Sequence, residues 1–193
     1  MAEREFSGTR RWLEKLNRDM KKKPLVINLI GGPGCGKSTA ASGLFYALKK
    51  LQVNAELSLE WVKNKVYEES FHCIDDQIYI FAKQHHKLFV LEDKVDVVVT
   101  DCSLLNSLVY GERRESFDAM VLDLFNEFNN LNIVIRRKQK YVTDGRMETA
   151  EEAMNIDDKY IEIMKKNNIP YLEIDNVDAC DFIVKYLIEN HLI

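Results

Sequence analysis

The stretch of sequence that decides the fold is Gly31-Gly32-Pro33-Gly34-Cys35-Gly36-Lys37-Ser38, which fits the pattern GxxxxGK[ST]. The apolar run Leu25–Ile30 precedes it, and apolar residues at helical spacing follow it. Glycines between a strand and a helix let the backbone wrap closely around phosphates, so that N–H groups and the helix N-terminus point at the negative charge. The sequence therefore predicts a phosphate-binding loop.

Each position of this loop has an expected role in binding ATP and Mg²⁺. Lys37 would reach the β- and γ-phosphates, the Ser38 hydroxyl would take one position on Mg²⁺, and Thr39 could contact the α-phosphate. The backbone cradle would be formed by Gly31, Gly32, Pro33, Gly34, Cys35 and Gly36. The alternative is a glycine-rich turn that matches the pattern by chance, and the flanking strand and helix argue against it.

Apolar spacing along the rest of the chain alternates strands with helices. We expect strands at residues 25–30, 54–57, 95–100, 133–135 and 171–174, and helices at 37–51, 60–69, 74–89, 120–128, 153–164 and 182–187. Parallel strands need long crossovers, so this alternation predicts an α/β fold. The expected form is a P-loop NTPase three-layer sandwich, with a central, mostly parallel five-stranded sheet and helices on both faces.

The composition is that of one globular domain. The chain has 193 residues, of which 46% are hydrophobic and 30% are charged, so it can bury a core. Its apolar stretches are far shorter than the roughly 20 residues that span a bilayer, and its four cysteines form no CxxC pair. We therefore expect no membrane partner and a location in a reducing cytoplasm.

Charge is distributed unevenly along the chain. The formal net charge is −4, which argues against indiscriminate binding along nucleic acid. Residues 1–23 carry eight basic and four acidic side chains, so this segment is +4 and the remainder is −8. Trp12 and Leu16 lie at helical spacing and Pro24 follows, so we expect a basic N-terminal helical extension at 1–23 and a single domain at 24–193.

The second half of an ATP site should be an acidic residue at the end of a neighbouring apolar strand. Asp101 follows Val97-Val98-Val99-Thr100 and meets this requirement. It would hold Mg²⁺ through water, or take the proton of an acceptor hydroxyl. The structural alternative is the N-cap of the next helix, for which Ser103 is an equally good residue.

Glu60 is a candidate for the acceptor side of the site. It follows the second predicted strand, at the sheet edge where ligands of open α/β folds bind. It could orient an acceptor or act as a base, whereas a glutamate in the first turn of a helix is also an ordinary partner of the helix dipole. Both interpretations stay open.

Basic residues gather after the fourth predicted strand, in Arg136-Arg137-Lys138-Gln139-Lys140-Tyr141 and Gly145-Arg146. A phosphoryl-transfer transition state spreads negative charge over the transferred oxygens, and arginines that arrive with closure neutralise it while excluding water. We therefore expect a lid segment near residues 136–150, with Arg137 and Arg146 as catalytic cations. The alternative is an ordinary solvated basic face.

Two further groups of side chains could contact a flat acceptor. The amides and imidazoles of one predicted helix could hydrogen-bond the edge of a base, although such residues usually face solvent: Gln77, Gln84, His85 and His86. Four aromatic residues could stack on it, although aromatic residues are more often core: Trp61, Tyr67, Tyr110 and Tyr141.

Several segments resemble a family of phage-encoded small P-loop kinases, over most of the chain from Pro24 to Asp175. The matching segments are Ile27-Asn28-Leu29-Ile30, Ala41-Ser42-Gly43-Leu44-Phe45, Glu60-Trp61-Val62-Lys63, Val95-Asp96-Val97-Val98-Val99-Thr100-Asp101 with Leu104-Leu105, and Tyr141 with Gly145-Arg146. This family is similar to thymidylate kinases and, more distantly, to ribosylnicotinamide kinases. Its best-understood branch, the 5-hydroxymethyl-deoxyuridine DNA kinase, phosphorylates the hydroxymethyl group of that base within phage DNA.

The resemblance implies ATP and Mg²⁺ at the phosphate loop and Asp101, a lid at 136–146, and the cytoplasm of an infected bacterium as location. Thymidylate kinases usually carry Asp-Arg after the third strand, whereas this chain has Asp101-Cys102-Ser103, which argues against a simple deoxynucleoside monophosphate kinase. The expected partner is phage DNA bearing a modified pyrimidine, because the basic extension favours a polyanionic acceptor. A free nucleotide or nucleoside acceptor, and a P-loop ATPase or nucleotide switch, are the alternatives. A homodimer is a further expectation.

Overall fold

Five strands form a sheet at the centre of the computed structural model, which describes residues 23–110, 114–137 and 149–193. The strands are β1 (Leu25–Ile30), β2 (Ala55–Ser58), β3 (Val97–Thr100), β4 (Asn129–Arg136) and β5 (Leu172–Asp175). Their order is β2-β3-β1-β4-β5, and every neighbouring pair is parallel. The predicted five-stranded α/β fold is confirmed, with a sheet that is wholly rather than mostly parallel.

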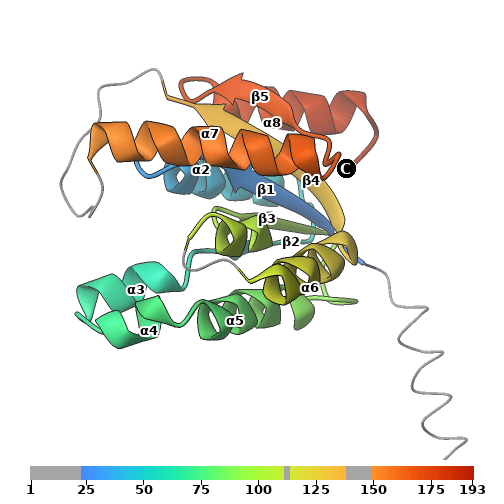
Figure 1. Cartoon of the computed structure of the whole chain (residues 1–193). Helices are drawn as coiled ribbons and strands as arrows, with labels where there is room; N and C mark the ends of the chain where they lie inside the picture. The colour runs from blue at the N-terminus through green and yellow to red at the C-terminus, as the bar shows by residue number, and fades with distance from the viewer. Residues whose placement is uncertain (1–22, 111–113, 138–148) are drawn as a thin grey trace, which may run out of the picture.

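Helices cover both faces of this sheet, as Figure 1 shows, with α7 in front of the strands and α2 and α8 behind them. One face is covered by α2 (Lys37–Lys50) and α8 (Ala179–Glu189). The other is covered by α5 (Gln77–Phe89), the 3-10 helix η1 (Leu104–Leu108), α6 (Glu115–Asn126) and α7 (Ala150–Lys166). None of the helices in the described ranges has the length and apolar character that a membrane crossing requires.

The strands are apolar on both sides because the sheet is covered on both sides. In β1, Ile27 and Leu29 pack into the core under α2 and α8. Val26 and Ile30 point the other way and pack into the core under α5, α6 and α7. This two-residue alternation is why a run with no polar face still forms a strand rather than a helix.

The predicted helix at 74–89 is wrong as a single element. The chain instead forms α4 (Phe71–Asp75) and α5, separated by a break at Asp76, whereas α3 (Val62–Tyr67) lies within the predicted helix at 60–69. Asp76 is the N-cap of α5, and its carboxylate accepts a hydrogen bond from the Tyr79 backbone N–H at 3.1 Å. A capping side chain ends one helix and starts the next without changing the apolar spacing, so periodicity alone could not locate this break.

Three asparagines fix the pairing of β1 with β4. Asn28 is 1% exposed and lies in register with Asn132. Its Nδ2 donates to the Oδ1 atoms of Asn130, at 2.9 Å, and Asn132, at 3.1 Å. Asn130 and Asn132 donate in turn to the carbonyls of Phe125 and Pro170. Because a buried amide is costly unless it is paired, these hydrogen bonds favour the observed register.

We expect Asn28→Ala to lower the free energy of unfolding by about 2 kcal/mol, because the amide oxygens of Asn130 and Asn132 lose their donor. Urea unfolding measures the change. The matched control is Asn155→Ala, on the exposed side of α7, which should stay within about 0.5 kcal/mol of the unchanged protein. Equal, small losses in both variants would contradict a role for Asn28 in setting the register.

Candidate active site

The predicted phosphate loop connects β1 to α2 and packs tightly against α7. Gly36, at the N-cap of α2, has a φ of +98°, which side chains rarely adopt. A Cβ on Gly32 would overlap the Ala153 carbonyl oxygen and lie 3.0 Å from Oδ1 of Asp157. The backbone conformation thus favours glycine at position 36, and the approach of α7 leaves no room for a side chain at position 32.

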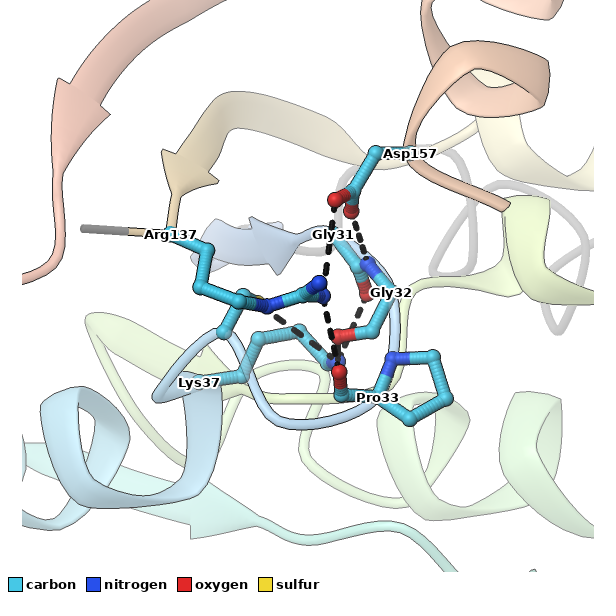
Figure 2. Close-up of polar contacts among 7 residues, drawn as sticks. Gly31, Gly32, Pro33, Lys37, Arg137 and Asp157 are labelled. Carbon is cyan, nitrogen blue, oxygen red and sulfur yellow. Dashed lines mark hydrogen bonds and ion pairs between the residues drawn. The ribbon is translucent and has the colours of Figure 1, made fainter. Parts of the chain in front are cut away.

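Lys37 lies on the inner side of this loop. Its Nζ donates to the Gly31 carbonyl at 2.6 Å and to the Gly32 carbonyl at 2.9 Å, as Figure 2 shows. Lys37, Ser38 and Thr39 also line the cavity that is described below. The Lys37 ammonium thus braces the first residues of the loop and brings positive charge to the place where the sequence predicts phosphates.

Asp101 joins the phosphate loop to the end of β2. The Ser38 hydroxyl donates to Oδ2 of Asp101 at 2.6 Å, and the Glu60 backbone N–H donates to Oδ1 at 2.9 Å. The carboxylate is 4% exposed. The N-cap of the following helix η1 is Ser103, which accepts from the Leu105 N–H. Ser103, and not Asp101, is therefore the N-cap of η1. Asp101 instead lies beside Ser38, whose hydroxyl is predicted to bind Mg²⁺.

The residues present fit ATP with Mg²⁺. Residues 31–36 supply a backbone cradle in which Gly31 and Gly32 leave little room for a side chain, and Lys37 donates to the carbonyls of these two residues. The hydroxyl of Ser38 and the carboxylate of Asp101 supply the oxygen ligands that Mg²⁺ takes. These two residues would hold the metal, and Lys37 with the loop backbone would hold the phosphates.

A cavity of about 450 Å³ opens beside the loop. The loop forms one wall, and the opposite wall is formed by α3, α4, the start of α5 and the segment around η1. Outside the loop, the lining residues are Glu60, Val62, Lys63, Val66, Tyr67, Ile74, Gln77, Ile80, Cys102, Asn106, Ser107, Tyr110 and Tyr160. The cavity therefore combines aromatic and apolar surface with amides, hydroxyls, the Lys63 ammonium and the Glu60 carboxylate.

Burial determines which groups in the cavity stay protonated. Burial first, and then the charges of Glu60 and Asp101, raises the pKa of the Cys102 thiol well above its ordinary value. Burial also raises the pKa of the Tyr160 phenol well above its ordinary value. Both groups are neutral near pH 7 and can only donate or accept hydrogen bonds. Glu60 and Asp101 remain as the candidate bases of this site.

Arg137 follows β4 and reaches the loop at Pro33. Its Nη2 donates to the Pro33 carbonyl at 2.8 Å and lies 3.5 Å from Oδ2 of Asp157, as Figure 2 shows. Oδ1 of Asp157 accepts a hydrogen bond from the Gly32 N–H. Arg137 does not line the cavity. The structure thus places this predicted catalytic cation on the backbone of the loop and not in the cavity wall.

Some predicted features lie outside the described residues. These are Arg146 and Tyr141, most of the predicted lid and nearly all of the basic extension.

Of the four predicted base-contacting residues, all of which are described, only Gln77 lines the cavity. His85 instead stacks between Phe81 and Phe89.

Sequence reasoning missed Asp157 and the contribution of Tyr160 to the cavity. Asp157 had a visible signal, because it lies four residues from both Ala153 and Ile161, which are buried positions of α7. A carboxylate on the apolar face of a helix needs a partner inside the fold. Tyr160 had no such signal, because an aromatic residue on an apolar face is also what a core requires.

The sequence from residue 26 to residue 179 matches the family model described as an AAA domain. This match contains the loop, Asp101, Arg137 and Asp157. The chain belongs to the AAA domain family. It is therefore a P-loop nucleotide-binding domain, and the finer resemblance to phage-encoded kinases stays a prediction.

No curated protein matches the sequence. One solved structure that does match is described as "Crystal structure of APE1195". It is 19% identical, the match covers 87% of this chain and 94% of that chain, and the TM-score is 0.48.

We expect Asp101→Asn to preserve the fold and to lower the rate of phosphoryl transfer or hydrolysis by at least about 100-fold. The amide oxygen of asparagine can still accept the hydrogen bond from the Glu60 N–H, but it lacks the negative charge that attracts Mg²⁺. ATP affinity is measured once with Mg²⁺ and once with EDTA. The substitution should weaken the affinity measured with Mg²⁺ and leave the affinity measured with EDTA unchanged. Asp123→Asn, on the exposed side of α6, is the control. A fully active Asp101→Asn protein would make Asp101 a structural residue, because asparagine keeps its shape.

Proposed function

We propose that this AAA domain is an ATP-dependent kinase that phosphorylates a hydroxyl group held in the cavity beside the loop. The position of Glu60 carries the proposal. The backbone N–H of Glu60 donates a hydrogen bond to Asp101, and Glu60 lines the same cavity as Lys37 and Ser38. A carboxylate there can face an acceptor hydroxyl while the loop holds the donor phosphates. About 450 Å³ is also within the range of sites that hold small ligands.

In the proposed reaction, Glu60 accepts the proton of the acceptor hydroxyl. The acceptor oxygen forms a bond to the γ-phosphorus of ATP, the bond between this phosphorus and the β,γ-bridging oxygen breaks, and ADP leaves. Lys37 offsets negative charge on the transferred oxygens. Bound Mg²⁺ would supply further charge neutralisation at the phosphates. Asp101 is engaged with Ser38 and with the Glu60 backbone, so we assign it to the metal and Glu60 to the proton.

The cavity wall supports a flat, hydrogen-bonding acceptor. Tyr67 and Tyr110 offer aromatic surface for stacking, while Gln77 and Asn106 offer amides that both donate and accept. A pyrimidine presents this combination of a flat face and a polar edge. We propose that the acceptor is the hydroxymethyl group of 5-hydroxymethyluracil in DNA, in agreement with the family resemblance. A base within a duplex would have to be extruded to enter such a cavity.

We expect Glu60→Gln to lower phosphoryl transfer by about 100-fold or more, because the amide keeps the shape of the side chain but cannot accept the proton. ATP affinity should be unchanged, since the backbone N–H on Asp101 remains. The measurements are product formation and equilibrium ATP binding. Glu56→Gln, which is exposed on β2, is the matched control. Undiminished transfer by a folded Glu60→Gln protein would remove Glu60 from the mechanism.

The acceptor class is tested with labelled ATP and four reactions: hydroxymethylated oligonucleotide, the matching mononucleotide, the matching nucleoside, and no acceptor. We expect label in the oligonucleotide, and an apparent affinity that falls steeply with salt because several phosphates are contacted. An Arg10→Gln/Arg11→Gln double variant should flatten that salt dependence if the basic extension contributes.

Each other outcome of this assay contradicts a specific part of the proposal. Transfer only to the mononucleotide or nucleoside would refute the DNA acceptor and retain a kinase. Release of phosphate without transfer to any acceptor would refute the kinase and indicate an ATPase or nucleotide switch. An unchanged salt dependence in the arginine variant would exclude those two arginines from DNA binding.

A further inference from the structure

Asp157 is a carboxylate placed next to a loop that is built to bind anions. Its side chain is 12% exposed, and it comes from the middle of α7, more than a hundred residues after the loop. One oxygen accepts from the Gly32 N–H, and the other faces the Arg137 guanidinium at 3.5 Å. The mechanism proposed above does not use this residue.

These contacts form a closed set around the start of the loop. Asp157 accepts a hydrogen bond from the Gly32 N–H, Arg137 donates to the Pro33 carbonyl, and Lys37 donates to the Gly31 and Gly32 carbonyls. Asp157 and Arg137 also hold each other, and their side chains are only 12% and 10% exposed. Figure 2 shows all of these side chains converging on the same three loop residues.

Charge alone predicts the opposite of what this geometry predicts. A negative group beside the loop should repel the phosphates of a nucleotide, so removing its charge should strengthen nucleotide binding. If Asp157 instead pre-orders the loop, removing it should weaken nucleotide binding, because a loop that is ordered before binding saves the entropic cost of ordering it during binding. The sign of the change in affinity therefore separates the two roles.

We propose that Asp157 is a positioning residue for nucleotide binding, which acts by holding Arg137 against the phosphate loop. The carboxylate balances the charge of the guanidinium and orients it toward Pro33, so the two side chains form one brace between β4, α7 and the loop. The proposal rests on the proposed function only in that the loop receives ATP. It does not depend on which acceptor, if any, is phosphorylated.

A double-mutant cycle on the full-length chain tests the brace. Mg-ATP affinity is measured by calorimetry, without acceptor, for the unchanged protein, Asp157→Asn, Arg137→Gln and the double variant. Asparagine keeps an oxygen for the Gly32 N–H and removes the charge that holds Arg137. We expect Asp157→Asn to weaken binding about tenfold in the native background and less than about twofold when Arg137 is already glutamine.

The control is Asp158→Asn, which removes the same charge from the next, exposed residue of α7. It should leave affinity within about twofold, so any effect of Asp157→Asn cannot be ascribed to the net charge of the helix. Because no acceptor is present, a failure of the kinase proposal would leave this test intact. Conversely, a normal affinity in Asp157→Asn would overturn this inference without affecting the kinase proposal.

Other results also overturn the brace. Tighter binding by Asp157→Asn would show that its charge, and not its positioning, dominates. Equal weakening in both backgrounds would show that Asp157 acts on the loop without Arg137. Asp157→Ser replaces the asparagine variant in the cycle if the latter does not melt cooperatively. Failure of both to fold, while Arg137→Gln folds, would assign Asp157 to the core and overturn the proposal.

Discussion

The pairing of β1 with both of its neighbours is the constraint on which the site depends. β1 is the central strand, and it pairs in parallel with β3 on one side and β4 on the other. Parallel strands end at the same edge of the sheet, so the residues after them meet there. The phosphate loop follows β1, Asp101 follows β3 and Arg137 follows β4. A shift of one residue in either pairing would move a carboxylate or a guanidinium away from the loop and turn its strand over.

Three carboxylates surround a loop that should attract negative charge, and their different partners give them different tasks. Asp101 is engaged by the Ser38 hydroxyl and a backbone N–H, which leaves it suited to share a metal ion with that hydroxyl. Asp157 is offset by the Arg137 guanidinium. Glu60 faces the cavity that the other two do not line. In the proposed mechanism, Asp101 acts through Mg²⁺, Asp157 is neutralised by Arg137, and Glu60 accepts the proton of the acceptor.

The sequence was sufficient for features that depend on local pattern and insufficient for those that depend on tertiary contact. The runs at β1 and β3 are apolar except for Asn28 and Thr100, and the glycine pattern lies between a strand and a helix, so the fold and the loop could be predicted. The cap at Asp76 was hidden because capping leaves apolar spacing unchanged. Asn130 and Asn132 also concealed the start of β4, because the hydrogen bonds that make them acceptable inside the sheet come from other segments. For the same reason Asp157 could be noticed as an anomaly, but its partners could not be named.

The two walls of the cavity differ in how firmly they are held, and this difference suits the proposed reaction. The loop is braced by Lys37, Arg137 and Asp157, and it joins a fully buried strand to a helix packed into the core. The opposite wall is partly built from α3 and α4, two short helices that contain no buried residues in the described structure. Elements with few buried contacts open and shift at low cost in free energy. A rigid donor side fixes the phosphates, whereas an adaptable acceptor side can close on a bound base and exclude water from the reacting oxygen.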